Sequence, residues 1–84
     1  MAYTVILKRQ AEKELDRLPT QIHSRIVHHL LALETDPRPP GNQKLQGHDG
    51  YRLRVGDYRI LYTVEDANRR VEVHAIGHRR EVYR

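Results

Sequence analysis

Three arginine side chains occupy alternating positions in two short runs of apolar and aromatic residues. Arg52 and Arg54 lie in the run YRLRV, and Arg59 lies in the run YRILYTV, which follows Gly56 and Asp57. A two-residue connection of this kind is typical of a β-hairpin and pairs Arg54 with Arg59. Because side chains alternate between the two faces of a strand, the three guanidinium groups share the face opposite the apolar residues.

This arginine face suits a phosphate or another anion. A guanidinium group binds phosphate bidentately, and a bound anion would offset the repulsion between Arg54 and Arg59, which costs up to about 1 kcal/mol in a bare sheet. A sheet with one buried face also turns charged residues outward without any ligand, so alternation alone fits either interpretation. No acidic residue lies near the three arginines on this face, because Asp57, the nearest candidate, sits in the turn, and this favours binding.

A second group of reactive side chains ends the chain, in the sequence GHRREVYR. Cleavage of RNA without a metal needs a base for the 2′-hydroxyl, cations for the charge on the phosphorus and a proton donor for the leaving oxygen. Arginine supplies charge but, with a pKa above about 12, transfers protons poorly at neutral pH. His78 and Tyr83 are the residues here with acid–base chemistry, although a tyrosine near a terminus can equally anchor the segment to its own domain.

The charge of the chain points to a polyanionic partner, either a nucleic acid or an acidic protein. The 84 residues carry a formal net charge of +4 and have a sequence pI of about 9.8. Residues 1–40 hold six Lys or Arg against five Asp or Glu, whereas residues 41–84 hold nine against six, and eight of those nine are arginine. The second half of the chain is therefore the expected binding half.

The elements that must position these groups follow from hydrophobic periodicity. Residues 8–18 and 20 to about 35 have apolar residues at helical spacing, with Pro19 between the two helices and Thr20 as the expected N-cap of the second. Ala11, Leu15 and Leu18 form the first stripe; Ile22, Ile26, Leu30 and Leu33, widened by Val27 and Leu31, form the second. Strands are expected at residues 2–7, 51–55, 58–64 and 71–76, and the proline-rich residues 36–42 form a connector.

The expected fold is α+β, in the order β-α-α-β-β-β. The helical hairpin packs on one face of a mostly antiparallel four-stranded sheet, and residues 1–84 form a single domain. His74 is expected on the solvent face of the last strand, beside Val71, Val73 and Ala75 on the core face.

Several classes of protein are disfavoured. The sequence has no cysteine, and its opening apolar run is far shorter than the roughly 20 residues that span a bilayer, so we expect a cytoplasmic protein that does not bind membranes. His23, His28 and His29 lack the spacing of three or four residues that places two ligands on one helical face, so no metal site is expected there.

The runs YRLRVGDYRILY, from Tyr51 to Tyr62, and GHRREVY, from Gly77 to Tyr83, resemble the RelE/ParE toxin superfamily. Within it they are most similar to the RelE-like mRNA endoribonucleases. DPRPP at residues 36–40 and the opening strand support the resemblance, which covers nearly the whole chain in the same order of elements.

The resemblance implies the toxin of a type II toxin–antitoxin pair. Such a toxin enters the ribosomal A site and cuts mRNA by attack of the 2′-hydroxyl on the adjacent phosphate, which leaves a 2′,3′-cyclic phosphate and a 5′-hydroxyl. It would need no metal and no other cofactor. Its partners would be mRNA on the ribosome and a cognate antitoxin, RelB-like or of another type.

The resemblance also implies roles for individual residues. Arg52 and Arg54 match the basic pair around the nucleophile, and Arg59 matches the phosphate-stabilising arginine. Arg79 matches the arginine near the leaving group, and Tyr83 the tyrosine that orients the nucleotide by stacking. The implied catalytic residues are Arg52, Arg54, Arg59, Arg79 and Tyr83, and the implied RNA-binding residues are Arg52, Arg54, Arg59, His78, Arg79 and Arg80.

The chain departs from the family pattern in two ways. Well-known nuclease members carry lysines at the positions of Arg52 and Arg54, which leaves the general base open between His78, Tyr83 and no efficient base. The chain also ends at Arg84, without the C-terminal helix of longer relatives. Two alternatives remain: a ParE-like toxin that acts on DNA gyrase, which Arg79 and Tyr83 disfavour, and a catalytically weakened module that binds RNA or antitoxin.

Overall fold

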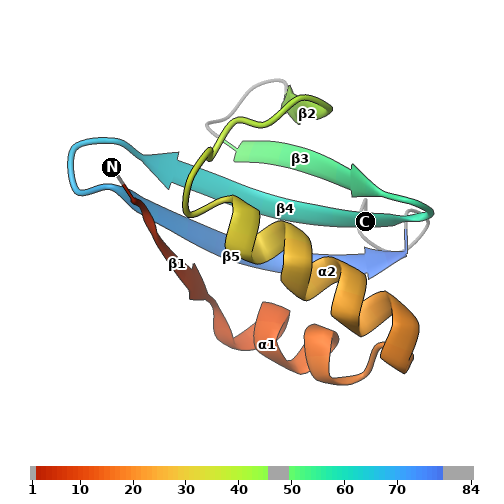
Figure 1. The fold of residues 1–84 in the computed structure, drawn as a ribbon. Coiled ribbons are helices and arrows are strands. Elements are labelled where there is room, and N and C mark those ends of the chain that lie inside the picture. The colour runs from red at the N-terminus through yellow and green to blue at the C-terminus, as the bar shows by residue number, and fades with distance from the viewer. Residues whose placement is uncertain (1, 46–49, 79–84) are drawn as a thin grey trace.

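The computed structural model describes residues 2–45 and 50–78 of the chain (Figure 1). Two helices and five strands follow in the order β1 (Thr4–Leu7), α1 (Arg9–Asp16), α2 (Thr20–Ala32), β2 (Asn42–Lys44), β3 (Gly50–Val55), β4 (Tyr58–Glu65) and β5 (Arg70–His78). The predicted α+β class and the order of its main elements are confirmed. The short strand β2 is an addition, because its polar sequence NQK carries no alternation that would predict a strand.

The five strands form one sheet in the order β1-β5-β4-β3-β2. β1 runs parallel to β5, and every other pair of neighbouring strands is antiparallel. The sheet is therefore mostly antiparallel, as predicted, with five strands rather than four. β1 and β2 occupy its two edges, and the described parts of both helices lie on one of its faces (Figure 1).

The two helices pack on the sheet through the expected apolar stripes. Ala11 and Leu15 of α1 are buried, as are Ile26 and Leu30 of α2. The apolar stripe predicted for the second helix was too wide, because Leu31, which was included in it, is 57% exposed. The predicted N-cap is also wrong by one residue: Pro19 occupies the N-cap position, Thr20 is the first helical residue, and no side chain caps the helix.

The sheet contributes its helix-facing side chains to the same core. Leu53, Val55, Ile60 and Tyr62 of the hairpin are buried together with Val71, Val73 and Ile76 of β5. None of the helices in the described residues is long and apolar enough to cross a membrane.

β5 departs from regular alternation at one point. Leu61 pairs with Ala75 and Tyr62 pairs with Val73, so His74 is an extra residue in a β-bulge. The bulge shifts the core-facing side from odd to even positions, and Ile76, 1% exposed, is buried where the sequence pattern placed Ala75. His74 is exposed, as predicted.

Candidate phosphate-binding site

The hairpin of β3 and β4 positions the three arginines of the arginine face. Gly56 begins its turn with φ 61°, in the left-handed region that glycine adopts without a steric penalty. The register pairs Arg54 with Arg59 and Arg52 with Leu61, as predicted. The side chains of these pairs lie on the face of the sheet opposite the helices.

The three arginines line a small pocket at this end of the sheet. Gly41 and Gln43, from β2 and the residue before it, form the remaining wall of a cavity of about 100 Å³. Gln43 is the cross-strand partner of Arg52, which explains how β2 reaches the arginine face. None of the described lining residues is acidic and three of the five are arginines, so positive charge is concentrated at this pocket.

Arg59 is the most unusual member of the pocket because it is only 9% exposed. Its Nη1 donates a long hydrogen bond of 3.4 Å to the carbonyl oxygen of Tyr58. Its Nε is buried and has no hydrogen-bond partner within the part of the chain that the structure describes. A buried donor without a partner costs about 1–3 kcal/mol, and an anion in the pocket would offset part of this cost by pairing with the guanidinium charge.

The other two arginines are more accessible. Arg54 is exposed and its Nε donates 3.4 Å to the carbonyl oxygen of Gly56, whereas Arg52 is half-buried. Chemically, the pocket offers three guanidinium groups and one amide, which can hold a phosphate and stabilise negative charge that develops on it. Its described lining residues are arginine, glutamine and glycine, which are not general-base residue types, so proton transfer requires another group.

The sequence did not identify Gly41 and Gln43 as lining residues of the pocket, or Arg25 as a neighbour of the hairpin. A carbon added at Gly56 would lie 3.6 Å from Nη1 of Arg25, so α2 brings a further guanidinium group to the tip of the hairpin. Neither Arg25, in the middle of a helix, nor Gln43, in a polar stretch, carries a pattern that points toward the sheet. Gly41 was a weak sequence signal for an unusual backbone conformation at this point. The structure shows that conformation, since its φ of 94° lies in the region that favours glycine.

His78 does not join the arginine pocket. It pairs with Tyr58 across the strands, and the two rings meet edge to face at 5.6 Å. Together with Glu14, Arg17 and Leu18 of the α1 region it lines a different cavity, on the helix side of the sheet. The structure therefore separates His78 from the arginines, and its predicted contact with RNA stays a prediction. Arg79, Arg80 and Tyr83 lie outside the described residues.

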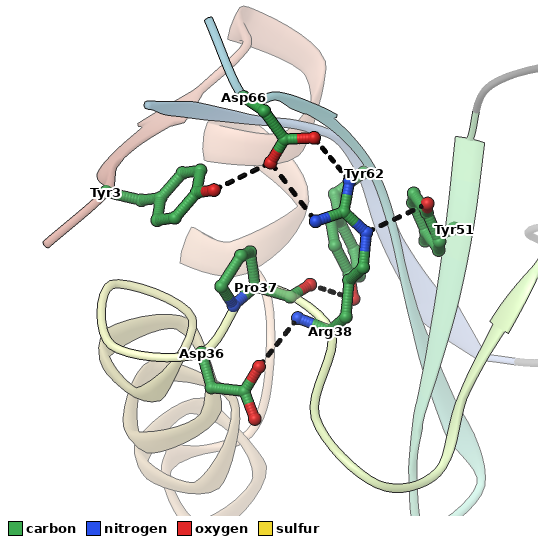
Figure 2. Close-up of polar contacts among 7 residues, drawn as sticks. All are labelled: Tyr3, Asp36, Pro37, Arg38, Tyr51, Tyr62 and Asp66. Atoms are coloured by element: carbon green, nitrogen blue, oxygen red, sulfur yellow. Dashed lines mark hydrogen bonds and ion pairs between the residues drawn. The ribbon is translucent and has the colours of Figure 1, made fainter. Parts of the chain in front are cut away.

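The connector that leads into β2 is held by a network around Arg38 (Figure 2). Arg38 forms two hydrogen bonds with the Asp66 carboxylate, of 3.1 and 2.9 Å, and donates a third, of 3.0 Å, to the hydroxyl of Tyr51. Tyr3 donates a hydrogen bond of 2.6 Å to the same carboxylate. We call these four residues the Arg38 network. It joins the connector to β3, to the start of β1 and to the β4–β5 turn.

The tyrosine rings beneath the connector complete this attachment. Tyr62 is 1% exposed and donates a hydrogen bond of 2.9 Å to the carbonyl oxygen of Pro37. Its ring stacks on that of Tyr51 at 5.7 Å, and Cζ of Arg38 lies 5.4 Å from the centre of the Tyr51 ring. The connector is therefore fixed at Pro37 and Arg38, only a few residues before it supplies Gly41 and Gln43 to the pocket.

The network shifts the pKa values of Asp66, Arg38 and Tyr3. The hydrogen bonds from Arg38 and then from Tyr3 lower the pKa of Asp66 to about 2, and the same contacts raise the pKa values of Arg38 and Tyr3. Burial raises the pKa of Tyr62 to about 12. Tyr3, Arg38, Tyr62 and Asp66 therefore keep their ordinary charges at neutral pH. This suits a structural contact that holds the connector, and not a residue that transfers protons.

Comparison with known proteins places the chain in a family. Residues 5–83 match the family described as ParE toxin of type II toxin-antitoxin system, parDE. The chain is 32% identical to Toxin RelE of Mycobacterium tuberculosis over 98% of its own length and 87% of that protein. It is 30% identical to Toxin RelG of the same organism, over 100% of its own length and 99% of that protein.

The fold agrees with this similarity. A crystal structure of the archaeal RelE-RelB complex from Pyrococcus horikoshii contains a chain that matches with a TM-score of 0.85 and 31% identity, over 98% of this chain and 100% of that one. The sequence match spans the sheet and both helices, including the hairpin that carries the arginine pocket. The chain belongs to the RelE/ParE superfamily of toxins of type II toxin–antitoxin systems.

Proposed function

We propose that this toxin is a ribosome-dependent endoribonuclease that cuts mRNA in the A site. A 2′-hydroxyl would attack the adjacent phosphate to give a 2′,3′-cyclic phosphate and a 5′-hydroxyl. The observation that best supports this is the buried Arg59 Nε without a partner, in an arginine pocket with no acid among its described lining residues. The naming of its relatives as RelE and RelG agrees with the nuclease branch.

Each arginine has a separate task in this proposal. The guanidinium group of Arg59 would donate to a non-bridging oxygen of the scissile phosphate, and the charges of Arg52 and Arg54 would stabilise the additional negative charge on the pentacoordinate phosphorus. The 2′-hydroxyl proton would pass to a group beyond the described lining residues, which is His78, Tyr83 or solvent. As the bond from phosphorus to the 5′-oxygen breaks, Arg79 would stabilise the charge on that oxygen, and solvent would supply the proton that makes it a 5′-hydroxyl.

The toxin would be inhibited by a cognate antitoxin in the cytoplasm. The archaeal relative was crystallised with RelB, and another solved structure is the intact RelBE complex of Escherichia coli. For this chain, a formal net charge of +4 favours an acidic partner. An antitoxin that covers the arginine pocket would explain inhibition.

The test is cleavage of an mRNA held on ribosomes with an open A site, followed by mapping of the cut and of its chemical ends. The wild-type chain should cut within the A-site codon and leave a 2′,3′-cyclic phosphate, and the product of a neighbouring antitoxin-like reading frame should prevent this. Arg59→Ala should lower the rate by about a hundredfold or more, as for other losses of a transition-state donor. Arg70→Ala is the matched control, because Arg70 lies on the same sheet and pairs with Glu72 outside the pocket.

The same purified protein distinguishes the nuclease from the main alternative, a toxin that acts on DNA gyrase. Intact mRNA on ribosomes, together with loss of DNA gyrase supercoiling, would replace the nuclease proposal by a gyrase-directed one. Intact mRNA without an effect on gyrase would leave a module that binds RNA or antitoxin. Equal cleavage by Arg59→Ala and wild type would remove the arginine pocket from the mechanism.

A further inference from the structure

A second hollow lies beside the arginine pocket on the same face of the sheet. Leu45, Gly50, Leu61, Thr63 and His74, with Tyr62, line a cavity of about 280 Å³. Its exposed lining is almost entirely apolar. Neither α1 nor α2 covers this face (Figure 1). Its volume lies just below the range of small-molecule sites, which begins at roughly 300 Å³, so the hollow has room for one small group such as a single base.

The register of the sheet explains why this hollow exists. Gly50 pairs with Thr63 and has no side chain to fill the space between β2 and β4. Leu45 continues β2, because its N–H donates 2.8 Å to the carbonyl oxygen of Gly50, and this places its side chain at the rim. The bulge in β5 leaves His74 without a cross-strand partner, between the partners of Leu61 and Tyr62, and His74 borders the hollow from the side of β5.

The hollow and the arginine pocket share a border. Arg52 lines the pocket and Leu61 lines the hollow, and these two residues are direct cross-strand partners. Along β4 the residues Arg59, Leu61 and Thr63 follow one another on one face, about 7 Å apart at each step. A nucleotide held by its phosphate at Arg59 can therefore reach the hollow with its base.

Thr63 and His74 are the lining residues with polar side chains, apart from the buried Tyr62. Thr63 Oγ1 and His74 Nε2 are 3.0 Å apart and hydrogen-bonded to each other. That bond leaves further hydrogen-bonding capacity on the hydroxyl and on Nδ1 of the ring. Unstacked RNA bases are recognised in this way, by apolar or aromatic contact on the ring and hydrogen bonds at its edge.

The charges beyond the hollow indicate which part of an RNA enters it. Past Thr63 the next cavity on this sheet is lined by Glu65 and Glu72 as well as Arg70. Carboxylates repel a phosphate, so the RNA backbone is expected to stay at the arginine end while a base points toward the acidic end. This favours a nucleobase as the occupant over a second segment of phosphate backbone.

We infer that the hollow formed by Leu45, Gly50, Leu61, Thr63 and His74 is a base-binding subsite that sets the nucleotide preference of this toxin. The inference rests on the proposed function, because the base belongs to the RNA whose phosphate occupies the arginine pocket. Leu45 and Leu61 hold the faces of the base, and Thr63 and His74 select its edge.

Equilibrium binding to non-cleavable RNA tests the subsite without any need for catalysis. The probes are four 2′-O-methyl trinucleotides that differ only in the central base, with the affinities measured on the whole chain. The wild type should prefer one base, and Thr63→Val and His74→Phe should each reduce that preference by about tenfold, as expected for the loss of one hydrogen bond. Thr4→Val, the same change on the opposite edge strand, should leave the preference intact.

The outcomes separate this inference from the nuclease proposal. Equal affinity for the four trinucleotides, no measurable affinity for any of them, or an unchanged preference in both variants would each overturn the subsite. Base preference that the variants remove, in a protein that cuts no mRNA on ribosomes, would support the subsite and reject the nuclease function. Arg59→Ala should weaken all four complexes alike, because a phosphate contact carries no base information.

Discussion

At the scale of single residues, Arg59 combines burial with an unmet hydrogen bond. Alternation along the strand was enough to predict that Arg59 shares a face with Arg52 and Arg54, because the period of a strand is two residues. Its burial could not be predicted, since the same alternation places the charged residues of this face in solvent. Nor could its neighbours in the pocket, because Gly41 and Gln43 come from a segment with no strand pattern.

This combination predicts a conflict between stability and binding. Replacing Arg59 by methionine removes a buried charge with an unpartnered donor and keeps a side chain of similar length. Such replacements are often neutral or stabilising, so Arg59→Met should raise the free energy of unfolding of the free toxin by about 1 kcal/mol. Urea unfolding with and without inorganic phosphate provides the measurement, and phosphate should stabilise only the wild type.

Arg54→Met is the control for this prediction, because Arg54 is exposed and loses little on replacement. Its stability without phosphate should match that of the wild type within about 0.5 kcal/mol. A lower stability of Arg59→Met than of wild type would show that Arg59 stabilises the free fold. The buried donor of Arg59 would then not carry the cost that we infer for it.

At the scale of elements, the Arg38 network decides how the connector reaches the arginine face. The two helices and the β3–β4 hairpin were predictable because their periodicity is local. β2 and the bulge at His74 were not, because β2 consists of polar residues that pair only with Tyr51, Arg52 and Leu53 of β3, and the bulge arises from the register of β4 against β5. Contacts between distant segments, and not local propensity, create both features.

The network also predicts a dependence of stability on pH. Asp66 has a pKa of about 2 in the folded protein, below its ordinary value of 3.8, so its contribution to stability is complete above about pH 4. The contribution decreases as the pH falls from about 4 to about 2, where the folded carboxylate takes up its proton. Asp66→Asn should therefore be less stable than wild type at pH 7, and the difference should shrink toward pH 2.

Urea unfolding of both proteins across this pH range measures the effect. Asp57→Asn provides the matched control, since Asp57 lies in the exposed turn of the hairpin and has no ion pair among the described residues. A difference between Asp66→Asn and wild type that stays constant from pH 7 to pH 2 would contradict the role given to the carboxylate.

At the scale of the whole molecule, the two faces of the sheet differ in their surroundings. One face lies under the helices (Figure 1) and contributes the core. The opposite face carries the arginine pocket and the hollow, for which we propose RNA binding. The sequence predicted this division, because one face of each hairpin strand is apolar. It could not show that the binding face is itself graded, from arginines through an apolar hollow to Glu65 and Glu72.

This gradation predicts how salt affects RNA binding. For a single strand, the slope of log K against log salt changes by about 0.7 for each phosphate that a basic side chain neutralises. Binding of a 2′-O-methyl RNA should lose about that much slope in Arg54→Ala, because its charge lies in the pocket. Arg70→Ala carries the same change in net charge at the acidic end of the same face, so its slope should equal that of the wild type. Equal losses of slope in the two variants would mean that total charge, and not the arginine pocket, holds the RNA.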